Sequence, residues 1–153
     1  MKSIVLDTNC LIASLPSRSP YHQAWSDFVE GKYILCVSNE ILTEYEEILA
    51  QKTNPIFANA VIKTILNRWN VRKIDPIFNF RLIKSDPDDD KFVNCAICGN
   101  ARFIVSEDAH FKHLKDIPFP CGSSSIKRVY ELASIRRINF NLFNNVMMSR
   151  SEN

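Results

Sequence analysis

SIVLD at residues 3–7 and RFIVSED at residues 102–108 share one pattern, a short apolar run rich in β-branched residues that ends in an acid. Runs of this length and composition predict buried strands. YILCVS at residues 33–38 and VRKID at residues 71–75 predict two further strands. Stretches with helical periodicity separate the four runs. This alternation predicts an α/β fold whose parallel sheet is covered by helices on both faces.

Helix start and stop signals lie between these strands. A helix is expected over residues 20–30, ended by Gly31. Ser38 is a favourable N-cap for the next helix, and Asn54, followed by proline, starts another. The apolar face of this last helix is expected to consist of Phe57, Val61, Ile62, Ile65, Leu66 and Trp69. We place Trp69 in the core.

The second half of the chain predicts two more helices. SDPDDD at residues 85–90 reads as a turn and a helix start, and the helix ends at Gly99 or Asn100. SSSIKRVYELASI at residues 123–135 is expected to form the last helix, after a serine cap. We therefore expect one domain that runs from residue 1 to residue 135. The amide-rich residues 136–153 form a C-terminal tail, either docked or frayed.

Composition points to a packed intracellular domain. At 153 residues, with 46% hydrophobic residues and 3 glycines, the chain can bury a core without disulfide bonds or a structural metal ion. A net charge of +2 is too mild to indicate nucleic-acid binding by itself. Five cysteines, an odd number, favour reduced thiols over a disulfide framework. No apolar stretch resembles a signal peptide or reaches the ~20 residues of a membrane helix, so we expect a cytoplasmic protein without a membrane partner.

Several acids are expected at one edge of the sheet. Asp7 and Asp108 each end a strand, and sites in open parallel sheets form outside the carboxyl ends of the strands. Asp89 lies three, four and seven residues before the apolar positions of its helix, which places it on the inward face at the helix start. Asp90 is rotated from that direction by about 100° and is expected to be a solvated charge.

One helix offers two candidate glutamates for the same edge. Glu44 and Glu46 flank opposite borders of the apolar stripe, each roughly 40° from its nearest apolar neighbour. Helical geometry does not choose between them. Asp7 also has two interpretations, because an Asp after a strand is equally well explained as the N-cap of the next helix.

Carboxylates that converge on one edge repel one another unless a cation joins them. Hard oxygen ligands of this kind suit Mg²⁺ or Mn²⁺. Such ions orient and activate water and neutralise the leaving oxygen of a phosphodiester. The acids therefore indicate metal-dependent phosphodiester hydrolysis. A phosphatase of the haloacid-dehalogenase type would need a second Asp two residues after Asp7, where this chain has Asn9.

Four motifs in this order resemble the PIN-domain nucleases (PilT N-terminus), and most resemble the branch that contains toxin components of toxin–antitoxin systems. The motifs are IVLDTNCLIAS (4–14), SNEILTEYEEIL (38–49), DPDDDKFVNCAI (86–97) and FIVSEDAHF (103–111). The resemblance covers about residues 2–125. By this resemblance the four catalytic and metal-binding acids fall on Asp7, Glu44, Asp89 and Asp108. The supporting positions fall on Thr8 and Asn9, which orient the first acid, on Asp90 beside the third, and on the hydroxyl of Ser106.

The resemblance implies a three-layer α/β/α fold with a central, mainly parallel sheet. It also implies Mg²⁺- or Mn²⁺-dependent cleavage of single-stranded RNA, an antitoxin protein as partner, and a homodimer. A second hypothesis keeps the PIN fold as an RNA- or protein-binding module with little or no catalysis. The presence of all four acids favours the enzyme.

Overall fold

Among the residues that the structure describes, the central sheet has four strands, all parallel. The computed structural model describes residues 3–19, 21–76, 88 and 90–106. The strands are β1 (Ser3–Leu6), β2 (Ile34–Val37), β3 (Val71–Lys73) and β4 (Phe103–Val105). Their order in the sheet is β3-β2-β1-β4, so β1 and β2 are central. The parallel sheet predicted from the four apolar runs is confirmed.

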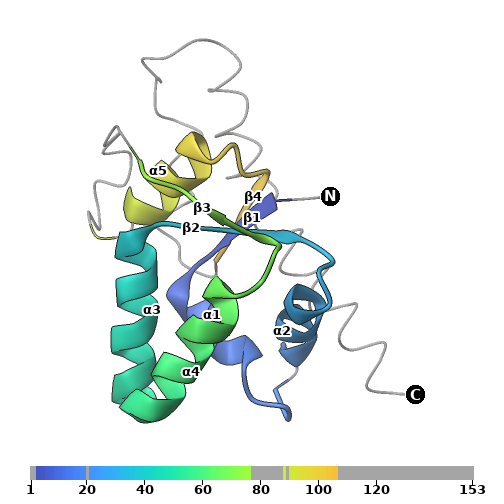
Figure 1. Cartoon of the computed structure of the whole chain (residues 1–153), viewed down its shortest axis with the longest axis vertical. Coiled ribbons are helices and arrows are strands. Elements are labelled where there is room, and N and C mark those ends of the chain that lie inside the picture. Colours follow the sequence, from blue (N-terminus) through green and yellow to red (C-terminus); the bar gives the residue numbers. More distant parts are fainter. Residues whose placement is uncertain (1–2, 20, 77–87, 89, 107–153) are drawn as a thin grey trace.

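Helices cover both faces of this sheet. They are α1 (Thr8–Ser14), α2 (His22–Val29), α3 (Asn39–Lys52), α4 (Pro55–Leu66) and α5 (Asp90–Cys98). Figure 1 shows α5 on one side of the sheet and the other four helices on the opposite side. The arrangement is a three-layer α/β/α sandwich, as expected.

The predicted helix starts are confirmed for α3 and α4. The hydroxyl of Ser38 accepts a hydrogen bond from the backbone N–H of Ile41 at 3.3 Å. The side chain of Asn54 accepts one from the N–H of Phe57 at 2.8 Å. Each bond satisfies an N–H that lacks a partner within the first turn. Because Ser38 directly follows β2, its cap also sets where α3 leaves the sheet.

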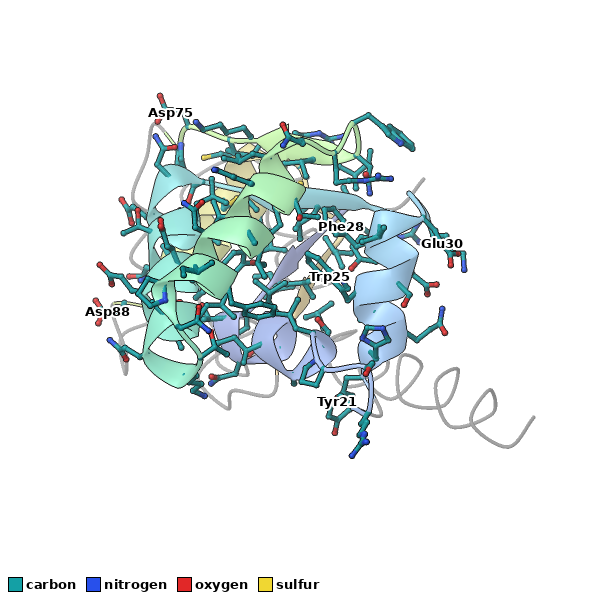
Figure 2. The ribbon with its side chains drawn as sticks, turned by 60° about the horizontal axis from the view of Figure 1, so that its bottom comes forward. Tyr21, Trp25, Phe28, Glu30, Asp75 and Asp88 are labelled. Atoms are coloured by element: carbon teal, nitrogen blue, oxygen red, sulfur yellow. The ribbon has the colours of Figure 1, made fainter. Side chains whose placement is uncertain are left out.

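Gly31 ends the turn after α2 and has a φ of +78°, a conformation that glycine adopts without strain. A Cβ atom at this position would lie 2.7 Å from the indole of Trp69. Beside this turn, Trp25 and Phe28 of α2 pack together with ring centroids 5.4 Å apart, as Figure 2 shows. The backbone angle therefore favours glycine at position 31, and a larger residue would also displace the exposed ring of Trp69.

The prediction that Trp69 belongs to the core is wrong, because its side chain is 70% exposed. The helix α4 ends at Leu66, so helical periodicity no longer describes Trp69. Phe57 and Leu66, also expected on the inner face, are 42% and 49% exposed. The face that packs inward is narrower and consists of Ala58, Val61, Ile62 and Ile65.

Several expectations concern other parts of the chain. The helix expected over residues 123–135, the tail at 136–153 and the domain boundary between them lie outside the described residues. The cysteines that the structure describes are all free, and Cys98 is exposed, whereas Cys10, Cys36 and Cys95 are buried. Among the described helices, none combines the length and the apolar character needed to cross a membrane.

Candidate functional site

The order of the strands singles out one place at the edge of the sheet. From β1 the chain continues to β2 and β3 on one side, and β4 lies on the other side of β1. In open parallel sheets, ligands bind outside the carboxyl ends of the strands where the order reverses in this way. Asp7 directly follows β1, and Ser106 directly follows β4. The reversal point is therefore lined by one predicted acid and one predicted hydroxyl.

Asp7 is held in place by the neighbouring strand. The hydroxyl of Ser106 donates a hydrogen bond of 2.7 Å to Oδ2 of Asp7, whose side chain is buried. The backbone N–H of Asp7 donates to the carbonyl of Val105 at 2.9 Å. Although Asp7 occupies the N-cap position of α1, its side chain makes no capping hydrogen bond. The side chain of Asp7 therefore does not act as the N-cap of α1, which was one of its two interpretations.

Glu44 reaches the same edge from α3. The hydroxyl of Thr8 donates a hydrogen bond to Oε2 of Glu44. Thr8 was expected to orient Asp7, but its hydroxyl bonds to Glu44. Glu46 is exposed, and Asn9 is exposed as well. Of the two candidate glutamates, Glu44 is therefore the one that contacts Thr8, the neighbour of Asp7.

A buried tyrosine fixes α3 against the end of β1. The hydroxyl of Tyr45 donates a hydrogen bond of 2.5 Å to the carbonyl of Leu6. Burial raises the pKa of Tyr45 well above its usual value, and the charges of Cys95 and Asp7 add to this effect. Tyr45 therefore remains a neutral donor at any physiological pH. Because Glu44 is the preceding residue, this bond also limits how far Glu44 can move from Asp7.

Lys91 of α5 is a site residue that the sequence did not reveal. Its ammonium lies 2.9 Å from Oε1 of Glu44, and only 16% of its side chain is exposed. It also lies 6.0 Å from the ring centroid of Phe92. The available signal was the lysine directly after three consecutive aspartates, Asp88–Asp90.

The environment of Asp90 differs from the expectation. A solvated charge was predicted, but Asp90 is only 6% exposed, and Asn94, one turn further on, is 8% exposed. The reason is that α5 is buried over the whole stretch Phe92–Ala96, rather than along one stripe. Asp89 lies outside the described residues, so the choice between Asp89 and Asp90 as the third acid stays a prediction. Asp88 is exposed and points outward at the periphery (Figure 2).

The donor groups agree in kind with a divalent cation. Asp7 and Glu44 supply carboxylate oxygens, which Mg²⁺ and Mn²⁺ prefer. Within residues 3–19, 21–76, 88 and 90–106, no three His, Cys, Asp or Glu side chains come together as a metal-binding group. Two of the four predicted ligands, Asp89 and Asp108, lie outside these ranges. The described part of the edge thus contains two of the expected carboxylates, each oriented by a hydroxyl.

The chain matches a known protein family over the region that forms this site. No curated protein matches the chain. A family model described as PIN domain matches residues 3–110 of 153, which is more than half of the chain and includes every described element. The parallel sheet, the described helices α1 to α5 and the acid at the end of β1 are all contained in the matched region. The chain therefore belongs to the PIN domain family, whose members are nuclease-type modules.

Proposed function

We propose that the protein is a Mg²⁺- or Mn²⁺-dependent endoribonuclease that hydrolyses phosphodiester bonds of single-stranded RNA. The observation that carries the proposal is the buried carboxylate of Asp7, held by Ser106 at the point where the strand order reverses. Membership of a family of nuclease-type modules supports hydrolysis of a nucleic acid. The choice of single-stranded RNA as the substrate rests on the resemblance of the four motifs to those of PIN-domain nucleases.

In this proposal the ligands of the cation are Asp7, Glu44, Asp89 and Asp108. When bound, a divalent cation supplies an activated water and neutralises charge on the phosphodiester. The protein contributes pre-organisation, since the hydroxyls of Ser106 and Thr8 fix the carboxylates of Asp7 and Glu44. Loss of a group that orients a metal ligand typically lowers metal affinity or activity by about 10- to 100-fold.

A matched set of variants tests the proposal. Labelled single-stranded RNA is incubated with the purified full chain and Mn²⁺, or with EDTA. We expect cleavage only with the metal, and none by Asp7→Asn although its circular dichroism spectrum is unchanged. Glu44→Gln should be strongly impaired, whereas Glu46→Gln, exposed on the same helix, should cleave like the wild type.

Single-stranded DNA and duplex RNA serve as comparison substrates for the same preparation. Faster cleavage of either one would contradict the assignment of the substrate class. Tight RNA binding by the wild type without metal-dependent cleavage would instead support the alternative of a binding module. Loss of folding in Asp7→Asn would show that Asp7 is a structural residue.

We also propose that the nuclease is the cytoplasmic toxin of a toxin–antitoxin pair, because its four motifs resemble that branch of the PIN-domain nucleases most. Induced expression should then arrest growth, and Asp7→Asn should abolish the arrest. Co-expression of the adjacent open reading frame should restore growth and yield a complex. Light scattering tests the expected homodimer. Normal growth during expression of an active nuclease would contradict the role as a toxin.

A further inference from the structure

We propose that Lys91 is a built-in counterion of Glu44 that competes with the divalent cation for this carboxylate, and that Lys91 thereby sets the metal affinity of the site. This inference rests on the proposed function. It concerns Lys91, a residue within the third motif to which the resemblance assigns no role and which the predicted ligand set does not include.

Both oxygens of Glu44 are already used by groups of the chain. The ammonium of Lys91 lies 2.9 Å from Oε1, and the hydroxyl of Thr8 donates to Oε2. The side chains of Lys91 and Glu44 are 16% and 25% exposed. Salt screens a partly buried pair of this kind less than it screens a pair on the open surface. The contact is therefore part of the site, and not an ordinary surface ion pair.

The two donors to Glu44 differ in how they affect a metal ion. A hydroxyl and a cation can share a carboxylate, because the hydroxyl carries no net charge. An ammonium and a divalent cation repel each other, so a metal that binds Glu44 must displace Lys91 or bind against its charge. Lysine can move aside, because its charge sits at the end of a flexible four-carbon stem. Helix α5 itself need not move.

Without metal, Lys91 has the opposite effect. Asp7 and Asp90 are buried and Glu44 is three-quarters buried, and Lys91 supplies positive charge beside Glu44. Removal of Lys91 should therefore lower the stability of the metal-free protein and, at the same time, tighten metal binding. A lysine with only a structural role would not produce these opposite changes, since its loss would weaken both the fold and the site.

The test compares Lys91→Met, which removes the charge at similar length, with Lys91→Arg, which keeps it. Mn²⁺ binding to the full chain is measured by titration calorimetry, and melting in EDTA is measured in parallel. We expect Lys91→Met to lower the Kd for Mn²⁺ about tenfold, which corresponds to ~1.4 kcal/mol. Lys91→Arg should stay within about twofold of the wild type. In a Glu44→Gln background, Lys91→Met should have no more than a small effect.

Each outcome decides between the possibilities. Equal or weaker Mn²⁺ binding by Lys91→Met overturns the competition, while Mn²⁺ binding by the wild type keeps the proposed metal site. Mn²⁺ binding by Lys91→Met but not by the wild type supports the competition, because Lys91 would then keep the metal off the site. An absence of binding in both proteins overturns the metal site and the competition together. Lys91→Gln keeps a hydrogen-bond donor for Glu44 without the charge, and it repeats the test if Lys91→Met does not fold.

Discussion

Ser106 and Asp7 are 99 residues apart in the chain, yet they are joined by a buried hydrogen bond of 2.7 Å. Because β1 and β4 pair in register, with Leu6 opposite Val105, the residues that follow them lie side by side. The hydroxyl of Ser106 thus selects one orientation of the Asp7 carboxylate. In a metal site, a group that orients a ligand in this way affects both metal affinity and activity.

We expect Ser106→Ala to lower RNA cleavage about tenfold, because Asp7 loses the donor that orients it. The free energy of unfolding should fall by about 2 kcal/mol, as for a hydrogen bond to a charged group. Ser3→Ala is the matched control, since Ser3 is also buried but its hydroxyl bonds to the carbonyl of Asn100 instead. Cleavage rates and urea melts of both variants check the prediction. Equal cleavage by the two variants would contradict the role of Ser106.

The third acid of the site gives a second prediction at this scale. On the helical register of the sequence, Asp89 faces the sheet, so Asp89→Asn should abolish cleavage and Asp90→Asn should reduce it only in part. Because Asp90 is buried, its replacement can also lower the stability of the protein. Melting curves must therefore accompany the cleavage rates. The reverse ranking of activity at equal stability would assign the third acid to Asp90.

Site residues could be predicted from the sequence where a local rule applied to them. Asp7 follows a strand, and Glu44 was chosen over Glu46 by resemblance to a known motif. The partner of each side chain could not be predicted in this way. Thr8 bonds to Glu44 over 36 residues and Lys91 bonds to it over 47 residues. Helical periodicity gives the face of a residue, but it does not say what that face meets.

Among the described elements, α3 carries the candidate ligand Glu44, and this helix is held at two points. Ser38 caps its first turn, and Tyr45 ties its middle to the carbonyl of Leu6. The strands and the helix starts were predictable because their signals are local: β-branched runs, and a cap residue before an apolar stripe. The exposure of Trp69 was not predictable, because this exposure depends on where α4 ends and on which residues pack against the indole ring.

We expect Ser38→Ala to lower the free energy of unfolding by about 1 kcal/mol, because an N–H of the first turn of α3 loses its acceptor. Thr43→Ala in the same helix is the control. Thr43 is exposed, and its hydroxyl only bonds back to the carbonyl of Asn39, so its loss should change stability by less than ~0.5 kcal/mol. Equal losses in the two variants, measured by chemical denaturation, would contradict a capping role for Ser38.

For the whole molecule, binding of a cation to the native state alone should raise the melting temperature. At ten times the Kd of the ion, the gain is about 1.4 kcal/mol. For a domain of this size it corresponds to roughly 3–6 °C. Mn²⁺ should produce this shift in the wild type and not in Asp7→Asn. A flat melting temperature up to high millimolar Mn²⁺ and Mg²⁺ would count against an assembled metal site.

The α/β class and the sheet were predictable for the molecule as a whole, since alternating strands and helices leave few topologies. The burial of α5 was not predictable, because helical periodicity identifies one buried face and does not show what covers the others. Asp90 and Asn94 show that α5 is covered on more than that face. An acid at the start of such a helix is then enclosed even when the sequence places it on the outer side.

The pairing of β1 with β4 also orders events during synthesis. β1 leaves the ribosome first, and it waits for about a hundred residues before the strand that completes its carboxyl edge follows. Until then Asp7 has no Ser106 beside it, because Ser106 directly follows β4. A nascent chain therefore carries the first acid of the proposed site without the hydroxyl that orients it. The proposed set of acids is complete only in chains that have been synthesised past β4 and Asp108.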